Sequence, residues 1–70
     1  MEKVFESSTF AAAMAKAKRE IKKEVANAHF YAEHFDDEHL TILNVLEPTD
    51  YFAEIWHLKD GTFEVVIRND

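Results

Sequence analysis

Residues 40–70, LTILNVLEPTDYFAEIWHLKDGTFEVVIRND, decide the fold of this 70-residue chain. Three runs in it, residues 40–47, 51–58 and 63–68, are rich in the β-branched and aromatic residues that favour strands. Pro48-Thr49-Asp50 separates the first two runs, and Asp60-Gly61 separates the last two. Because Asp-Gly between apolar runs is a strong hairpin signal, the segment predicts three antiparallel strands.

A long amphipathic pattern precedes these runs. Ser7, Ser8 and Thr9 are candidate helix N-caps. Apolar residues then recur at steps of three or four: Phe10, Met14, Ala17, Ile21, Val25, Ala28, Ala32 and Phe35. The pattern predicts one helix over residues 8–35, roughly 40 Å long, with a bend near Asn27 as an alternative. The fold class is therefore α+β, one helix on a three-stranded antiparallel sheet, with residues 1–70 as a single domain and residues 3–6 compatible with a short edge strand.

Pairing about Asp60-Gly61 divides the predicted sheet into two faces and sets Trp56 opposite Val65. The face that should receive the helix holds Leu40, Ile42, Leu46, Phe52, Trp56, Leu58, Phe63, Val65 and Ile67. The other face holds a second apolar group, mixed with polar residues: Leu43, Val45, Tyr51, Ile55 and Val66. Because one helix covers one face, Leu43, Val45, Ile55 and Val66 are predicted to form an uncovered patch and a candidate homodimer interface.

The composition narrows the class of protein. There is no cysteine, which excludes disulfides and thiolate metal sites. The N-terminal residues carry no signal-peptide pattern, and no apolar run is long enough to span a membrane. We therefore expect a cytoplasmic protein without a membrane partner.

The charge is uneven along the chain. The net charge is −6, but residues 1–32 carry +2 and residues 33–70 carry −8. An acidic half of this kind repels nucleic acid and attracts basic partners. We therefore expect no direct binding to nucleic acid.

Acidic residues form two groups. Glu33, Asp36, Asp37 and Glu38 lie where the predicted helix should end, although negative charge opposes the helix dipole there. Glu47, Asp50, Glu54, Asp60, Glu64 and Asp70 lie on the predicted strands and turns. Carboxylates on neighbouring strands combine into a negative surface that imitates the phosphates of a duplex. The alternative is that both groups are ordinary solvated charges. Glu54 is predicted to point inward beside Asn44.

Two further groups, one of histidines and one of basic residues, are candidate sites. His29, His34, His39 and His57 do not share a helical face, and the His34–Glu38 pair lacks a third zinc ligand, so we predict no metal site. Lys16, Lys18, Arg19, Lys22 and Lys23 resemble a phosphate-binding patch, but Glu20 and Glu24 interleave with them, which favours a solvated helix face.

The sequence offers little for catalysis. It contains no nucleophile elbow, no phosphate-binding glycine loop and no zinc signature. A small hydrolase or metal enzyme using His34 and Glu38 is the weakest of the alternatives. The protein is therefore predicted not to be an enzyme and to need no cofactor.

In its size, its carboxylates from Glu33 to Asp70 and its lack of cysteine, the chain resembles the small acidic inhibitors that bacteriophages make to take over host proteins. Some of these act as DNA mimics. The five basic residues on the predicted helix depart from that pattern and favour mimicry by one face only. The resemblance implies an inhibitor in the host bacterial cytoplasm.

The leading hypothesis is thus a DNA mimic that blocks the basic DNA-binding surface of a partner, such as a histone-like nucleoid protein. Its candidate partner-binding residues are Glu33, Asp36, Asp37, Glu38, Glu47, Asp50, Asp60 and Glu64. The alternative is a homodimeric structural or regulatory module that uses the uncovered sheet face.

Overall fold

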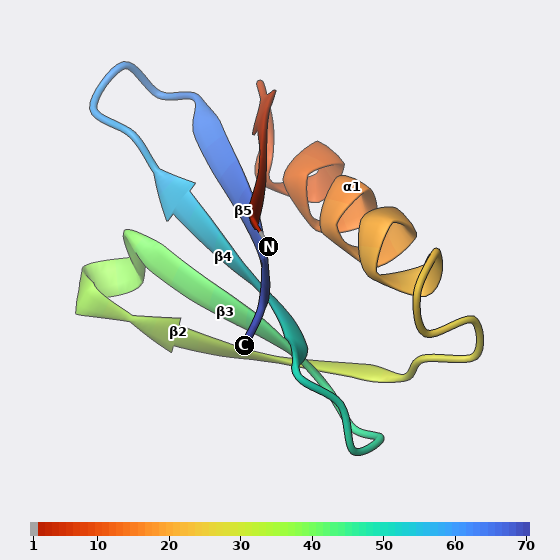
Figure 1. Ribbon diagram of the computed structural model, residues 1–70. Helices are drawn as coiled ribbons and strands as arrows, with labels where there is room; N and C mark the ends of the chain where they lie inside the picture. Colours follow the sequence, from red (N-terminus) through yellow and green to blue (C-terminus); the bar gives the residue numbers. More distant parts are fainter. Residues whose placement is uncertain (1) are drawn as a thin grey trace.

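The computed structural model describes residues 2–70. Its elements are β1 (Glu2–Ser7), α1 (Phe10–Lys22), β2 (Phe30–Phe35), the 3-10 turn η1 (Asp36–Glu38), β3 (Leu40–Val45), β4 (Tyr51–His57) and β5 (Phe63–Asn69). The strands form one antiparallel sheet in the order β1-β5-β4-β3-β2, with α1 on one side (Figure 1). The predicted α+β class is confirmed, but the sheet has five strands rather than three. The short N-terminal edge strand is present as β1.

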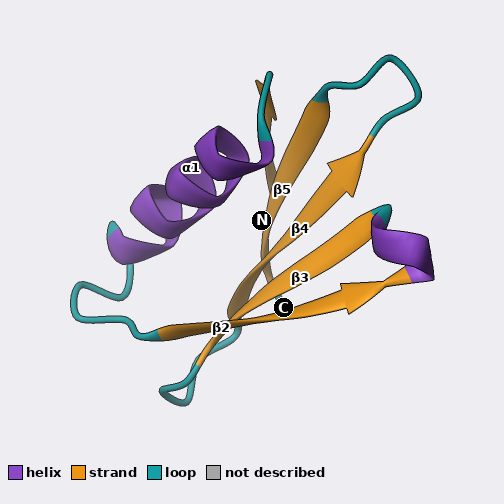
Figure 2. Ribbon diagram, turned by 180° about the vertical axis from the view of Figure 1, so that it is seen from behind, coloured by secondary structure: helices purple, strands orange, loops and turns teal. Residues whose placement is uncertain are grey.

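Helix α1 begins where the sequence predicts. The Thr9 hydroxyl accepts a hydrogen bond from the backbone N–H of Ala12 at 3.1 Å, which caps the first turn. Ala13, Ala17 and Ile21 are fully buried against the sheet, and the two alanines keep the helix close to it. Within residues 2–70, no helix or strand covers the opposite side of the sheet (Figure 2). Within residues 2–70, no helix is long and apolar enough to cross a membrane.

The predicted helix is about twice as long as the observed one. It ends at Lys22, and residues 30–35 form β2, which pairs with β3. The sequence Phe-Tyr-Ala-Glu-His-Phe is rich in aromatic residues, which favour strands. Pairing with β3 satisfies backbone groups that β3 would otherwise leave open, so a tertiary contact overrides the helical periodicity.

The predicted register of the last hairpin is wrong by one residue. The strands end at His57 and Phe63, which are partners across the sheet. The Asp60 carboxylate accepts hydrogen bonds from both the backbone N–H and the hydroxyl of Thr62, and the Leu58 N–H donates to the Thr62 carbonyl. This longer turn sets Ile55, not Trp56, opposite Val65. A shift of one residue moves every side chain of a strand to the other face.

The faces of β3 and β4 are therefore exchanged relative to the prediction. Leu43 and Ile55, predicted in an uncovered dimer interface, are 1% and 2% exposed in the core under α1. Val45 packs against the same core, so only Val66 of the predicted dimer interface lies on the side away from the helix. Trp56, predicted under the helix, also faces away from it, as do Leu40, Ile42 and Phe52.

Candidate functional site: the open face of the sheet

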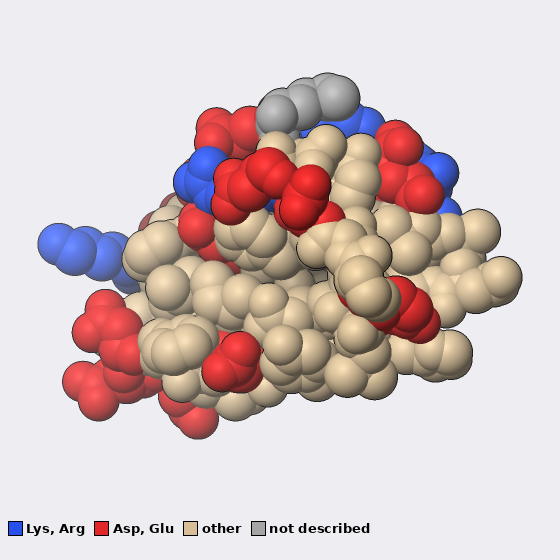
Figure 3. All heavy atoms as spheres, turned by 60° about the horizontal axis from the view of Figure 1, so that its bottom comes forward, with Lys and Arg blue, Asp and Glu red and all other residues tan. Residues whose placement is uncertain are grey.

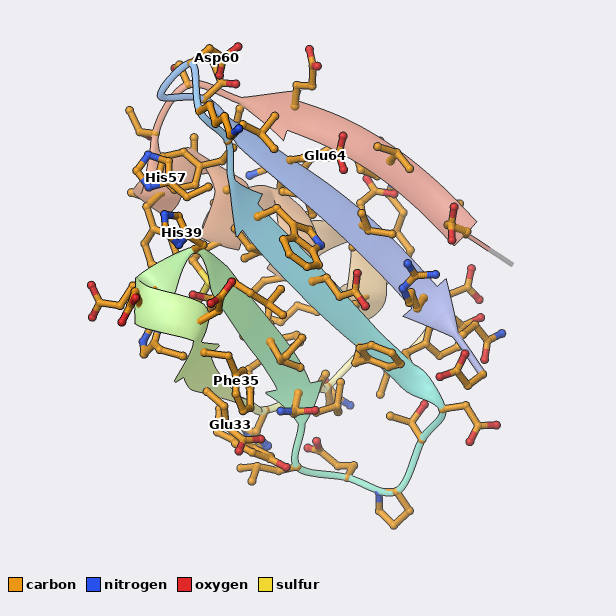
Figure 4. The ribbon with its side chains drawn as sticks, turned by 90° about the vertical axis from the view of Figure 1, so that its left-hand side faces the viewer. Glu33, Phe35, His39, His57, Asp60 and Glu64 are labelled. Atoms are coloured by element: carbon orange, nitrogen blue, oxygen red, sulfur yellow. The ribbon has the colours of Figure 1, made fainter. Side chains whose placement is uncertain are left out.

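The face of the sheet turned away from α1, here called the open face, is not covered by any helix or strand within residues 2–70. The strand register places alternate residues there: Glu2, Val4 and Glu6 from β1; Glu64, Val66 and Arg68 from β5; Phe52, Glu54 and Trp56 from β4; Leu40, Ile42 and Asn44 from β3; Tyr31, Glu33 and Phe35 from β2. Figure 4 looks onto this face, with Glu33 and Phe35 near one edge and Glu64 on β5.

The apolar side chains of the open face are partly exposed. Val4 is 52% exposed, Tyr31 46% and Phe35 45%, while Trp56 and Phe52 are half-buried among their neighbours. Figure 3, in which the bottom of Figure 1 comes forward, shows acidic side chains spread over a largely uncharged surface, with basic side chains at its margins. Exposed large apolar side chains that stand among polar ones, such as Tyr31 and Phe35 on β2, mark candidate interaction surfaces.

Arg68 is the only lysine or arginine that residues 2–70 place on the open face, and carboxylates bind it on both sides. Its Nε lies 3.0 Å from Glu54 Oε2, and its Nη1 donates to Glu2. Glu54 also accepts a hydrogen bond from the indole N–H of Trp56 at 3.1 Å. Hydrogen bonding to Glu54 and the charges of both carboxylates raise the pKa of Arg68. Glu54 is thus partly buried and paired with Arg68. It lies on the open face, however, and not under the helix as the sequence predicted.

The basic residues gather on the opposite side of the molecule. Five of them belong to α1 and its C-cap, and Lys3 lies on the helix side of β1. Glu20, 5% exposed, stands among them, with its carboxylate 2.8 Å from Lys23 Nζ, 3.3 Å from Lys16 Nζ and 3.9 Å from Lys3 Nζ. Hydrogen bonding to Lys23 is the main reason that the pKa of Glu20 is lowered. Glu20 thus contacts three of the six basic residues but offsets only one of their positive charges.

The eight predicted partner-binding acids do not form one cluster. Glu33 and Glu64 are on the open face, and Glu33 accepts a hydrogen bond from the Asn44 side chain at 3.0 Å. Asp36, Asp37 and Glu38 do not end a helix: they form a left-handed turn between β2 and β3, with φ of 52°, 53° and 68°. The expected conflict with a helix dipole therefore does not arise.

The remaining acids lie in loops, and two of them have structural roles. Glu47 accepts hydrogen bonds from the His29 backbone N–H and from His29 Nδ1, which tie the connection between α1 and β2 to the β3–β4 turn. These bonds lower the pKa of Glu47, and the bond from the His29 backbone N–H has the largest effect. The hydrogen bonds from Thr62 lower the pKa of Asp60. Asp50 is exposed in the β3–β4 turn.

Sequence reasoning missed the contribution of β1 to this face. Glu2 and Glu6 were counted with the basic half of the chain, but they share the open face, where Glu6 lies directly opposite Glu64. Like charges placed opposite each other destabilise a sheet. The signal was the alternation of Glu2, Val4 and Glu6 with Lys3 and Phe5, which has the two-residue period of a strand.

Three histidines meet on the helix side, at the end of the sheet that α1 leaves open. His34, His39 and His57 line a hollow of about 420 Å³, and the last two lie side by side in Figure 4. His34 Nδ1 lies 2.9 Å from the Thr41 hydroxyl, but Thr41 is 2% exposed, so this pair cannot present a nucleophile to a substrate. Among residues 2–70, no group of three or more His, Asp or Glu residues is arranged to hold a metal ion.

Comparisons with protein-family models, with curated proteins and with solved structures find no match to this chain. The geometry and charge of the open face therefore carry the functional argument.

Proposed function

We propose that the protein is an acidic binding module that places the open face of its sheet on the basic, DNA-contacting surface of a partner, such as a histone-like nucleoid protein. It thereby acts as a one-sided DNA mimic and inhibitor. The observation that carries the proposal is the separation of charge between the two sides of the molecule. The open face holds five carboxylates and one arginine, whereas six basic residues lie on the helix side.

This separation orients the molecule toward a basic partner. Among residues 2–70, the one arginine of the open face is paired with Glu2 and Glu54, so it does little to oppose binding to a basic surface. The acids of η1 extend the negative potential beyond the end of β2. Such a potential increases the rate of encounter with a positive partner and depends on salt.

The exposed aromatic residues refine the kind of partner surface that we expect. Tyr31, Phe35 and Trp56 lie between carboxylates rather than apart from them. Arginine and lysine side chains bind both groups, because their charged heads pair with carboxylates and their stems and cationic heads pack on aromatic rings. A DNA-binding surface rich in arginine and lysine matches this arrangement.

Competition at rising salt tests the proposal. A purified histone-like nucleoid protein is bound to a labelled DNA duplex. The 70-residue chain is then titrated into this complex at several salt concentrations. We expect it to displace the duplex, with an affinity that falls steeply as salt increases. An affinity for the nucleoid protein that does not change with salt concentration would contradict the proposal. So would a complex in which the nucleoid protein binds this chain and the duplex at the same time.

Matched charge variants locate the binding surface. Glu33→Gln and Glu64→Gln each remove one charge from the open face and should weaken binding up to about five-fold, the effect of an exposed ion pair worth about 1 kcal/mol. Glu24→Gln removes the same charge beside the helix, near Lys3 and Glu20, and should leave the affinity unchanged. Equal effects of the three variants would show that only net charge matters.

A further inference from the structure

Strand β2 ends the sheet on one side, and its outer edge is unpaired. Within residues 2–70 its only strand partner is β3. Five of its six residues are exposed, Phe30 being the exception. An edge strand that is open on its outer side presents unpaired N–H and C=O groups to another strand.

The register identifies which backbone groups point outward. The Leu46 N–H donates to the His29 carbonyl at 2.8 Å, so His29 and Leu46 are a hydrogen-bonded pair of the β2–β3 ladder. Hydrogen-bonded and non-bonded pairs alternate in an antiparallel ladder. Tyr31, Glu33 and Phe35 therefore bond to β3, and the backbone groups of Phe30, Ala32 and His34 point away from the sheet.

The two edges of the sheet are protected to different degrees. The other edge, β1, carries three charged residues among its six, including Lys3. Charged residues, lysine above all, discourage pairing at an edge. β2 carries one formal charge, Glu33, and three aromatic residues, with no proline or lysine. Strand pairing is therefore expected at β2.

The sequence of β2 is complementary to itself in one antiparallel register. Pairing about Ala32 sets Phe30 opposite His34 of a second copy and Tyr31 opposite Glu33 of that copy. All three outward-pointing residues then fall at hydrogen-bonded positions, which gives six backbone hydrogen bonds. Pairing about Glu33 would instead set two carboxylates opposite each other, which is destabilising.

We propose that two copies of this chain pair through β2, antiparallel and centred on Ala32, to form a continuous ten-stranded sheet. The two-fold axis of this pairing is perpendicular to the sheet, so both helices lie on one side and both open faces on the other. At about 4.8 Å between strands, the joined open face is roughly 43 Å wide. The dimer depends on the β2 edge alone and does not require the proposed function.

The molecular mass in solution tests the pairing. Sedimentation equilibrium of the full chain from 10 µM to 1 mM should show a shift from 8.2 kDa toward twice that mass. Ala32→Pro removes an N–H that points outward, so it should leave the β2–β3 ladder intact while abolishing the dimer. A strict monomer at 1 mM, or a folded Ala32→Pro protein that still dimerises, would overturn the proposal.

Cross-linking tests the register and does not depend on the folding of the proline variant. The chain lacks cysteine, so Ala32→Cys introduces one thiol, which under oxidation should form a covalent dimer across the two-fold axis. The expected Cα–Cα distance there, about 5.5 Å, suits a disulfide. Ala26→Cys, exposed outside the strand, is the matched control and should stay monomeric. Faster cross-linking of Glu33→Cys than of Ala32→Cys would overturn the Ala32-centred register.

Discussion

The two faces of the sheet differ in what holds their side chains in place. On the helix side, Leu43, Ile55 and Val65 are buried by α1 and fill a continuous apolar core. On the open face, Trp56 and Val66 are shielded only by their neighbours on the same sheet, and carboxylates stand among them. The first face stabilises the fold, and the second is free to meet a partner. Large apolar side chains are thus not a reliable mark of the core in a chain this small.

A matched pair of isoleucines gives the largest expected difference between the faces. Ile55→Ala removes a buried side chain of the core and should lower the free energy of unfolding by about 2–5 kcal/mol. Ile42→Ala, on the adjacent strand but on the open face, should cost clearly less, since Ile42 is only partly buried. Urea unfolding followed by circular dichroism measures both. Equal losses would mean that the open face is as important for stability as the core.

A second comparison uses one carboxylate from each side. Glu20→Gln leaves Lys3, Lys16 and Lys23 without their shared partner and should lower the melting temperature. Glu64→Gln relieves the repulsion from Glu6 and should leave the melting temperature unchanged or raise it.

The pH dependence of stability gives a further test of the role of Glu20. Because the folded-state pKa of Glu20 is lowered, its stabilisation is complete above the unfolded pKa of about 4.5 and is lost as the pH falls through the folded value. The stability difference between the wild type and Glu20→Gln should therefore vanish in acid. A difference that does not shrink as the pH falls below 4.5 would contradict this account of Glu20.

The smallest expected effect concerns the start of the covering helix. Thr9→Ala removes the cap of α1 and should destabilise the fold by about 1 kcal/mol. The neighbouring change Ser8→Ala is the control, since α1 is capped by Thr9. Thermal unfolding should separate the two variants. Hydrogen exchange should show faster opening at Ala12 and Ala13 in Thr9→Ala only.

The sequence pattern predicted the first half of the helix correctly because local and tertiary requirements agree there. Thr9 caps, and Ala17 and Ile21 face the sheet as their spacing requires. Beyond Lys22, the local and the tertiary requirements disagree. Ala32 and Phe35 continue the helical spacing, but the aromatic residues around them pair with β3. Periodicity alone cannot show that another strand will offer a partner.

The candidate site was harder to predict, because its position depends on one residue of register. The Asp60–Thr62 hydrogen bonds lengthen the last turn, and this moves Trp56 and Glu54 to the open face. Glu2 and Glu6 reach the same face only through the pairing of β1 with β5 at the far end of the chain. Neither the Asp60–Thr62 hydrogen bonds nor the pairing of β1 with β5 has a local sequence signal strong enough to predict it.

The pairing of β1 with β5 has a consequence for how the protein folds. Glu2 and Arg68 lie opposite each other across the sheet, so this pair of strands joins residues separated by nearly the whole chain. Contacts between distant residues slow folding, because the loop between them must close first. On the ribosome, β1 has no strand to pair with until β5 has emerged from the exit tunnel. We therefore expect β1 to dock last, after the meander from β2 to β5 has formed.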